Sequence, residues 1–182
     1  MDEARLVKTS KFLSYHLRHR PGELGLAALA PGGWVPVQAL LAASARKGFP
    51  IACEELEEVV TRNDKRRFAF DESGTFIRAR QGHSTPVDLG LEPVEPPPAL
   101  YHGTRDKSLP AVLREGLKKR RRHHVHLSSD EETARRVGAR RGRPVVLEVD
   151  ARAMRRDGHD FYLSENGVWL VERVPPRYLR RL

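Results

Sequence analysis

FAFDESGTFIR, residues 68–78, has the pattern of a β-hairpin. Its side chains alternate with a period of two on both sides of DESG, which is a turn signal. The sequence before it predicts three helices, because apolar residues recur there at helical spacing. These helices span residues 3–19, 37–46 and 54–62. Three helices followed by a hairpin is the order of elements in a winged helix, a relative of the helix-turn-helix motif.

After residue 99 the sequence predicts strands that alternate with short helices, which favours an α+β fold. The predicted strands span 99–104, 125–128, 144–150 and 168–171, and the predicted helices span 109–115 and 130–138, with Ser129 or Asp130 as N-cap of the second helix. Residues 81–99 are rich in Pro and Gly and predict an extended linker. We therefore expect a lobe over 1–80, a linker over 81–99 and a second lobe over 100–182.

Composition excludes several classes of protein. The 182 residues suffice for one domain or two small ones, and no run approaches about 18 apolar residues, so no membrane span is expected. The opening MDEARLVKTS lacks the apolar segment of a secretory signal. Cys53 is the only cysteine, which excludes an internal disulfide and a cysteine-based zinc site, and we expect it to be a small core residue. A cytoplasmic monomer is the simplest expectation.

The net charge of +9 points to a polyanionic partner. Most of the excess lies in residues 100–182, which carry 20 basic and 11 acidic side chains. Nucleic acid is the favoured partner, since the basic run KKRRR at 118–122 adjoins no amphipathic apolar helix that would suit a lipid surface. A solvated basic surface without a partner is the alternative.

Two basic motifs in the first lobe suit phosphate. Arg18 and His19, in LRHRP, combine a planar guanidinium fork with a donor that titrates near neutral pH. Cations at a helix C-terminus also complement the helix dipole, which is the structural alternative. NDKRRF places Lys65, Arg66 and Arg67 at the start of the hairpin, where they would meet a nucleic-acid backbone or guard a sheet edge. If the strand has begun there, Arg66 and Arg67 point to opposite faces.

Two further motifs lie in the second lobe. KKRRRHHVHLS at 118–128 places His124 and His126 on one strand face, with Arg122 if the strand extends that far. Two histidines without a matching Cys, Asp or Glu pattern are too few for zinc, so we expect no metal. YHGT at 101–104 ends a strand on a glycine, which would allow a ligand to approach the backbone. The chain lacks GxGxxG, GxxxxGK[ST] and HExxH, which disfavours Rossmann, P-loop and zincin functions.

The order and spacing of these motifs resemble one family. The segments SKFLSYHLRHRP, GGWVPVQALL, NDKRRFAF, IRARQGHS, LYHGT, HVHLS, PVVLEVDA, FYLSENGVWL and VPPRYL are similar to those of the NAD⁺-dependent RNA 2′-phosphotransferases, also called tRNA 2′-phosphotransferases. The resemblance covers residues 8–179. It implies a winged-helix RNA-binding lobe joined to an NAD⁺-binding lobe of the ADP-ribosyltransferase type.

The resemblance also implies a reaction. In this family an RNA 2′-phosphate, such as the one left at a splice junction in tRNA splicing, attacks the nicotinamide ribose of NAD⁺ and nicotinamide leaves. In the resulting 2′-phospho-ADP-ribosylated RNA, the ribose 2″-hydroxyl then attacks the phosphorus. The products are RNA with a 2′-OH and ADP-ribose 1″,2″-cyclic phosphate, and no metal is required.

The family's functional residues map onto this chain motif by motif. The tetrad Arg-His-Arg-Arg maps onto Arg18, His19, Arg67 and Arg122, with Arg121 as the alternative for the last position. The NAD⁺-binding positions map onto His102, Gly103, Thr104, His126, Leu127, Ser128, Ser164 and Asn166, with Gly167 in the same SENG segment. Lys8 and Lys11 on an exposed helix face, together with Lys65, are the expected RNA-binding lysines.

Two other functions stay open at this point. One is an ADP-ribosyltransferase that modifies phosphorylated nucleic-acid ends, which would keep every site residue and change only the acceptor. The other is a winged-helix nucleic-acid-binding regulator without catalysis, which leaves YHGT, HVHLS and SENGVWL without a role. Where many ADP-ribosyltransferases carry a catalytic glutamate, this chain has the apolar strand 168–171, which argues against protein ADP-ribosylation.

Overall fold

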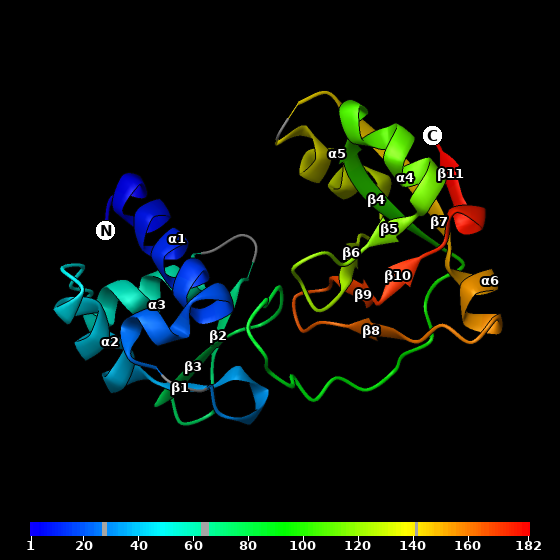
Figure 1. The fold of residues 1–182 in the computed structure, drawn as a ribbon. Helices are drawn as coiled ribbons and strands as arrows, with labels where there is room; N and C mark the ends of the chain where they lie inside the picture. The colour runs from blue at the N-terminus through cyan, green and yellow to red at the C-terminus, as the bar shows by residue number, and fades with distance from the viewer. Residues whose placement is uncertain (27–28, 63–65, 141) are drawn as a thin grey trace. The chain divides into compact units, whose positions relative to one another are not determined.

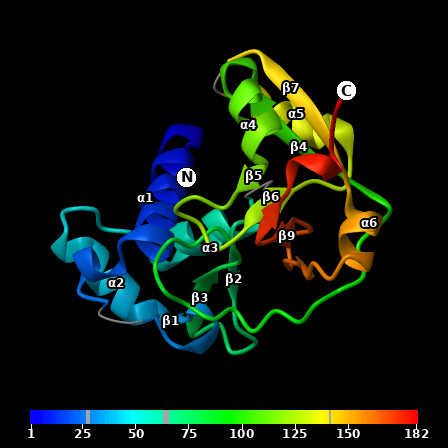
Figure 2. The ribbon, with the colours of Figure 1, turned by 45° about the vertical axis from the view of Figure 1, so that its right-hand side comes forward.

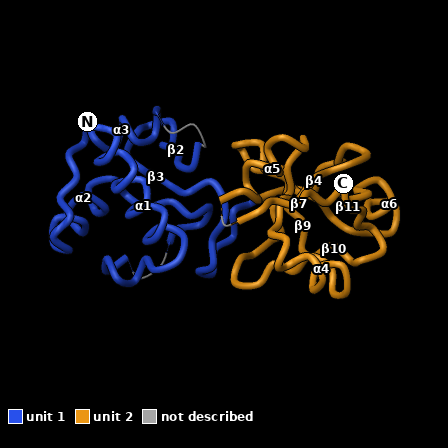
Figure 3. The backbone as a smooth tube through the Cα atoms, turned by 90° about the horizontal axis from the view of Figure 1, so that it is seen from above, with its two compact units in different colours: residues 1–90 blue, residues 91–182 orange. Residues whose placement is uncertain are grey.

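The computed structural model describes residues 1–26, 29–62, 66–140 and 142–182. The chain forms two compact units, residues 1–90 and 91–182, which Figure 3 shows in different colours. Both units combine helices with small antiparallel sheets, so the predicted α+β class is confirmed. In the described ranges no helix is both long enough and apolar enough to cross a membrane.

The helices of unit 1 form where the sequence predicts them (Figure 1). They are α1 Glu3–His19, α2 Val37–Arg46 and α3 Cys53–Thr61, with the short turns η1 Pro21–Leu24 and η2 Pro31–Gly33 between α1 and α2. The Asp2 carboxylate caps α1 by accepting a hydrogen bond from the Arg5 N–H at 2.7 Å. Cys53 is exposed at the first position of α3, so the prediction of a core cysteine is wrong. The buried side chains of that helix begin one turn later, at Leu56 and Val59.

The predicted hairpin is confirmed and a third strand extends it. β2 Phe68–Phe70 pairs antiparallel with β3 Phe76–Ala79, and β1 Val35–Pro36 pairs with the other edge of β3. The sheet order is β1-β3-β2. The sequence analysis missed β1 because a two-residue strand is too short to show alternation. The sheet and the three helices share one apolar core, which includes Leu13, Leu17, Leu40, Leu56, Phe68 and Ile77.

Unit 2 contains two three-stranded sheets. β4 Ala99–Arg105, β7 Pro144–Asp150 and β11 Leu179–Arg181 form the first, and β6 Val125–Leu127, β8 Phe161–Leu163 and β9 Trp169–Val171 form the second. A short ladder pairs β5 Leu117–Lys118 with β10 Arg173–Val174. Tyr101 and Ser128 exchange backbone hydrogen bonds of 2.9 and 2.8 Å, which ties β4 to the end of β6.

The helices of unit 2 are α4 Leu109–Glu115, α5 Glu131–Ala139 and α6 Ala151–Arg156, and the turns are η3 Asp106–Ser108 and η4 Pro176–Tyr178. Asp130, one of the two expected residues, caps α5. α5 packs on β4 and β7 (Figure 2). A Cβ on Gly103 would lie 1.7 Å from the Ala134 carbonyl oxygen. The absence of a side chain at this glycine therefore allows α5 to pack closely on β4, and the prediction that a ligand approaches the same backbone stays a prediction.

The Pro/Gly-rich segment predicted as a linker makes contacts at both of its ends. The Gly32 N–H donates to the Asp88 carbonyl at 2.8 Å within unit 1. In unit 2 the Val94 N–H donates to the Phe161 carbonyl at 2.7 Å, and Pro93 bridges to Tyr162 at the edge of β8. The boundary between the compact units, at residues 90 and 91, falls inside this segment.

Candidate functional site

In unit 1 the structure places Arg18 and His19 in the last turn of α1. Nδ1 of His19 lies 2.9 Å from Oγ of Ser84. The Arg18 guanidinium lies over the ring of Phe68, with 6.0 Å from Cζ to the centroid. The end of α1 thus contacts both β2, through Phe68, and Ser84.

Arg67 comes to the same helix from the hairpin. Its Nη1 donates to Oγ of Ser10, in the middle of α1, at 3.4 Å. β2 begins only at Phe68, so the prediction that Arg66 and Arg67 take opposite faces of a strand does not apply. Arg66 instead has φ 41°, a left-handed conformation that few residues other than glycine adopt. Arg18, His19 and Arg67 are therefore all held at α1 or its contact with β2.

The predicted RNA-binding lysines of α1 are accessible. Lys8 and Lys11 are exposed and lie outside the buried stripe of Leu6, Leu13 and Leu17. Lys65 lies outside the described residues.

In unit 2 three of the predicted residues are linked by hydrogen bonds. Nη1 of Arg122 donates to Nδ1 of His126 at 3.2 Å. The His126 carbonyl in turn accepts a hydrogen bond from Nδ1 of His102 at 3.0 Å. β6 begins at Val125, so the strand does not extend back to Arg122, and the condition under which Arg122 would share a strand face with the histidines is not met. It reaches His126 from the turn at 119–122, which is closed by a 3.1 Å hydrogen bond from the Arg122 N–H to the Lys119 carbonyl.

The two histidines have opposite tautomers when neutral. A carbonyl can only accept, so His102 carries its proton on Nδ1, and Nε2 is its acceptor. Arginine can only donate, so Nδ1 of His126 accepts and its proton lies on Nε2. Burial lowers the pKa of His102, and the positive charge of Arg122 lowers it further, although the His126 carbonyl opposes both effects. His102 is therefore uncharged at neutral pH.

Several of the predicted NAD⁺-binding residues have structural roles. Leu127 is 2% exposed and its side chain packs in the core. Gly103 gives room to α5, and Ser128 pairs with Tyr101. Thr104 is half-buried on β4, opposite Val145.

Ser164 and Asn166 form the turn between β8 and β9. The buried Ser164 hydroxyl lies 2.8 Å from Oδ1 of Asn166 and accepts a hydrogen bond from the Val168 N–H at 3.0 Å. Gly167 has φ 78°, which favours glycine, and its N–H donates to the Ser164 carbonyl at 2.8 Å. The SENG segment is thus a rigid turn that presents the half-buried Asn166 and the exposed Glu165.

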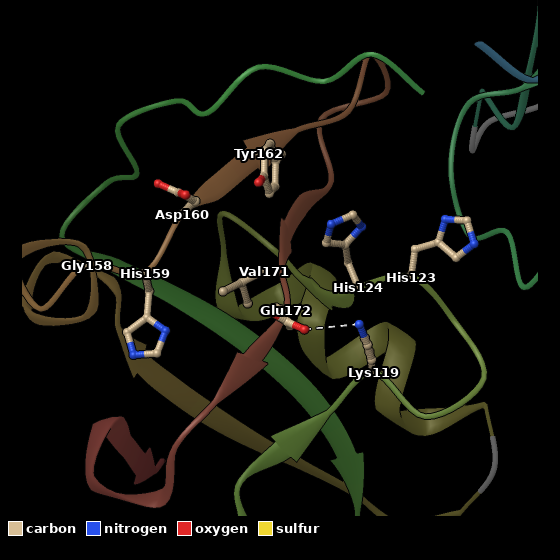
Figure 4. Close-up of a pocket in the computed structure, with 9 residues that line it drawn as sticks. All are labelled: Lys119, His123, His124, Gly158, His159, Asp160, Tyr162, Val171 and Glu172. Atoms are coloured by element: carbon tan, nitrogen blue, oxygen red, sulfur yellow. Dashed lines mark hydrogen bonds and ion pairs between the residues drawn. The ribbon is translucent and has the colours of Figure 1, made fainter. Parts of the chain in front are cut away.

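A polar pocket of about 350 Å³ lies at the opposite end of the β6-β9-β8 sheet from this turn. Figure 4 shows His123 and His124 beside the ion pair of Lys119 and Glu172, whose atoms are 3.2 Å apart. The rings of His124 and Tyr162 lie 5.3 Å apart. None of the predicted site residues lines this pocket. Within the described ranges, no group of three or more His, Cys, Asp or Glu side chains is arranged to hold a metal ion.

The sequence analysis missed two partners of the site residues, Ser10 and Ser84. Ser10 is one of the buried residues of α1. Ser84 lies in IRARQGHS, one of the segments that carry the family resemblance, and the sequence predicts no role for it. Contacts across 57 and 65 residues leave no periodic signal in the sequence.

The comparisons with known proteins agree with one another. The family model described as RNA 2′-phosphotransferase, Tpt1 / KptA family, matches residues 4–173. A probable RNA 2′-phosphotransferase of Trichormus variabilis is 60% identical over 182 residues, which cover both chains completely. One of Streptomyces coelicolor is 59% identical over 180 residues, covering 99% of this chain and 97% of the relative. One of Burkholderia pseudomallei is 49% identical over 174 residues, covering 96% and 94%.

Both units of this α+β chain carry arginine and histidine side chains, Arg18, His19 and Arg67 in unit 1 and His102, Arg122 and His126 in unit 2, which are residue types that bind phosphate groups. The match over nearly the full length identifies it further: the chain belongs to the RNA 2′-phosphotransferase, Tpt1 / KptA family. The resemblance stated from the sequence is thereby confirmed.

Proposed function

We propose that this protein removes an internal 2′-phosphate from RNA by transferring it to NAD⁺, without a metal ion. The products would be RNA with a 2′-OH, nicotinamide and ADP-ribose 1″,2″-cyclic phosphate. Family membership supports the transfer of an RNA 2′-phosphate. The observation that carries the proposal is the hydrogen-bonded series Arg122–His126–His102, which joins a phosphate-binding side chain to an uncharged histidine.

We assign RNA binding to unit 1 as a winged helix. Its support is the order of three helices followed by the β1-β3-β2 sheet. We assign NAD⁺ binding to unit 2 as an ADP-ribosyltransferase-like fold. Its support is the pair of three-stranded antiparallel sheets that carry His102 and His126.

The residues of unit 2 suit NAD⁺. The nicotinamide ring is cationic while it is attached to the ribose, so a protonated histidine beside it would repel it. His102 is kept uncharged by burial and by Arg122, and its Nε2 can accept a hydrogen bond. We propose that His102 and the backbone of β4 and β6 hold NAD⁺, with Asn166 presented by the SENG turn. NAD⁺ supplies an activated ribose carbon with nicotinamide as the leaving group.

The arginines supply electrostatic stabilisation. The 2′-phosphate is already an anion, so its attack needs positioning more than a general base. Arg18, Arg67 and Arg122 would each serve as a phosphate-binding side chain, and His19 would assist the second step, in which charge shifts on phosphorus. Ser10 and His126 restrict the rotamers of Arg67 and Arg122 before the substrate binds. The exposed Lys8 and Lys11, with Lys65, would contact flanking phosphates.

The test is to incubate the protein with NAD⁺ and a short RNA bearing one internal 2′-phosphate, with a chelator present. Loss of the phosphate only with NAD⁺ is the expected result. RNA that stays unchanged would remove the proposal. ADP-ribose on a terminal phosphate would instead support the end-modifying transferase, and binding without turnover would support the regulator.

Fractionation of the source cells is expected to place the protein in the cytoplasm.

A further inference from the structure

The segment QGHS, residues 81–84, follows β3 and has no role in the reaction as described so far. It begins where the hairpin ends and reaches the end of α1. The Arg80 N–H donates to the Arg67 carbonyl at 2.9 Å, and four residues later the Ser84 N–H donates to the Arg18 carbonyl at 2.8 Å. The stretch from Arg80 to Ser84 therefore contacts the backbone of Arg67 and Arg18, the two arginines of unit 1 that the proposed function assigns to phosphate.

The backbone of this segment is held firmly. Gly82 has φ 86°, so the turn there requires the left-handed region that glycine tolerates. His83 is 1% exposed, which anchors the segment in the interior. The N–H groups of Ser84 and Thr85 both donate to the Arg18 carbonyl, at 2.8 and 3.2 Å. The last-turn carbonyls of a helix lack partners within the helix, so these bonds attach the segment to the end of α1.

The Ser84 hydroxyl then meets His19. Its Oγ lies 2.9 Å from Nδ1, a distance typical of a good hydrogen bond. A hydroxyl both donates and accepts, so Ser84 can hold the ring whether Nδ1 carries a proton or not. A carbonyl or a carboxylate at this place would hold only the form protonated at Nδ1. A hydroxyl partner such as Ser84 therefore suits a histidine that changes its protonation state during a reaction.

We infer that Ser84 is a positioning residue for His19: it fixes the imidazole ring so that Nε2 is the nitrogen presented to the phosphate. This inference rests on the role of His19 in the proposed function. Ser84 itself need not touch the substrate. Its hydroxyl acts through the ring, and the rest of QGHS acts by holding that hydroxyl at the end of α1.

The test compares Ser84→Ala, Ser84→Thr and the control Thr85→Ala, each in the full chain and checked for unchanged thermal unfolding. Thr85 is the neighbouring hydroxyl residue and shares the backbone contact with Arg18, whereas the contact with the His19 ring is made by Ser84. Single-turnover kinetics measure nicotinamide release and cyclic-phosphate formation separately. We expect Ser84→Ala to slow cyclic-phosphate formation about 10-fold, with little change in nicotinamide release. Ser84→Thr keeps the hydroxyl and should restore the rate, and Thr85→Ala should match the wild type.

A double-mutant cycle separates positioning from a general structural role. In a His19→Ala background, Ser84→Ala should cause no further loss, because the ring it holds is gone. An equal additional loss in that background, or a wild-type rate for Ser84→Ala, would overturn the inference. An inactive wild type would instead refute the proposed function, so the two failures are distinguishable. A normal rate for His19→Ala would refute the role of His19 and this inference with it.

Discussion

Nη1 of Arg122 lies 3.2 Å from Nδ1 of His126 and donates a hydrogen bond to it. The sequence left the last tetrad position open between Arg121 and Arg122, and this contact supports the proposal that it is Arg122. Within the run of arginines at 120–122, Arg120 has φ 55°, a left-handed conformation that few residues other than glycine adopt.

Arg122→Ala should reduce the rate of dephosphorylation at saturating NAD⁺ by about 100- to 1,000-fold, the usual cost of one transition-state donor. Arg121→Ala is the matched control, since it removes the same charge one residue away. Single-turnover rates with a 2′-phosphorylated RNA measure both. If the two variants lost activity equally, the effect would be one of net charge, and the assignment of Arg122 would be wrong.

Unit 2 should become less stable as the pH falls below about 6.5. The pKa of His102 is lowered by burial, so the unfolded chain binds more protons than the folded chain between that lowered value and about 6.5. This contribution to stability is present above the unfolded pKa and is lost as the pH falls through the folded one. Urea unfolding between pH 5 and 7.5 should show a shallower pH dependence for His102→Gln than for the wild type.

The pH dependence of urea unfolding should be measured for His124→Gln as well. Burial, followed by the charges of His123 and Lys119, also lowers the pKa of His124, so this variant should flatten the curve in the same direction. A pH dependence unchanged in both variants would contradict the lowered pKa of these two histidines.

Gly103→Ala should destabilise unit 2 by about 3 kcal/mol or more, because the added methyl group cannot fit between β4 and α5. Its Cβ would lie 1.7 Å from the Ala134 carbonyl oxygen and 2.8 Å from the Gly138 nitrogen, which are backbone atoms that cannot rotate away. Gly22→Ala is the control, since a Cβ there meets no atom within 4 Å. Urea denaturation compares the two variants. A Gly103→Ala protein as stable as the control would show that α5 does not pack this closely.

Replacing Lys8 and Lys11 together with Ala should weaken RNA binding and lower its salt dependence. Each lost contact with a single-stranded phosphate reduces the slope of log K against log salt by about 0.7, so the pair should reduce it by about 1.4. Titrations of RNA at several salt concentrations give the slope. Lys47→Ala, in the exposed C-cap of α2, is the control. An unchanged slope in the double variant would place the RNA on another face.

The sequence by itself determined the local structure wherever the signal was local. The helix 3–19 follows from the spacing of Leu6, Ser10, Leu13 and Leu17, all of which are buried, and the hairpin follows from DESG between two alternating runs. The same holds for α2, α4, α5, β4 and β7, whose patterns extend over six residues or more. The motifs along the whole length were also enough to identify the family, because their order can be read from the sequence without the fold.

Tertiary structure alone decided which atoms meet. β1, β5 and β10 are two residues long, so only their pairing with distant strands makes them strands. The close packing of α5 on Gly103 also depends on the tertiary structure, since YHGT contains no signal for it. The sequence contained Ser84 and His19, but their contact spans 65 residues and depends on the turn at Gly82 and the burial of His83. Hydrogen bonds between side chains act over about 3 Å of space, and the sequence does not specify which residues are brought within that range.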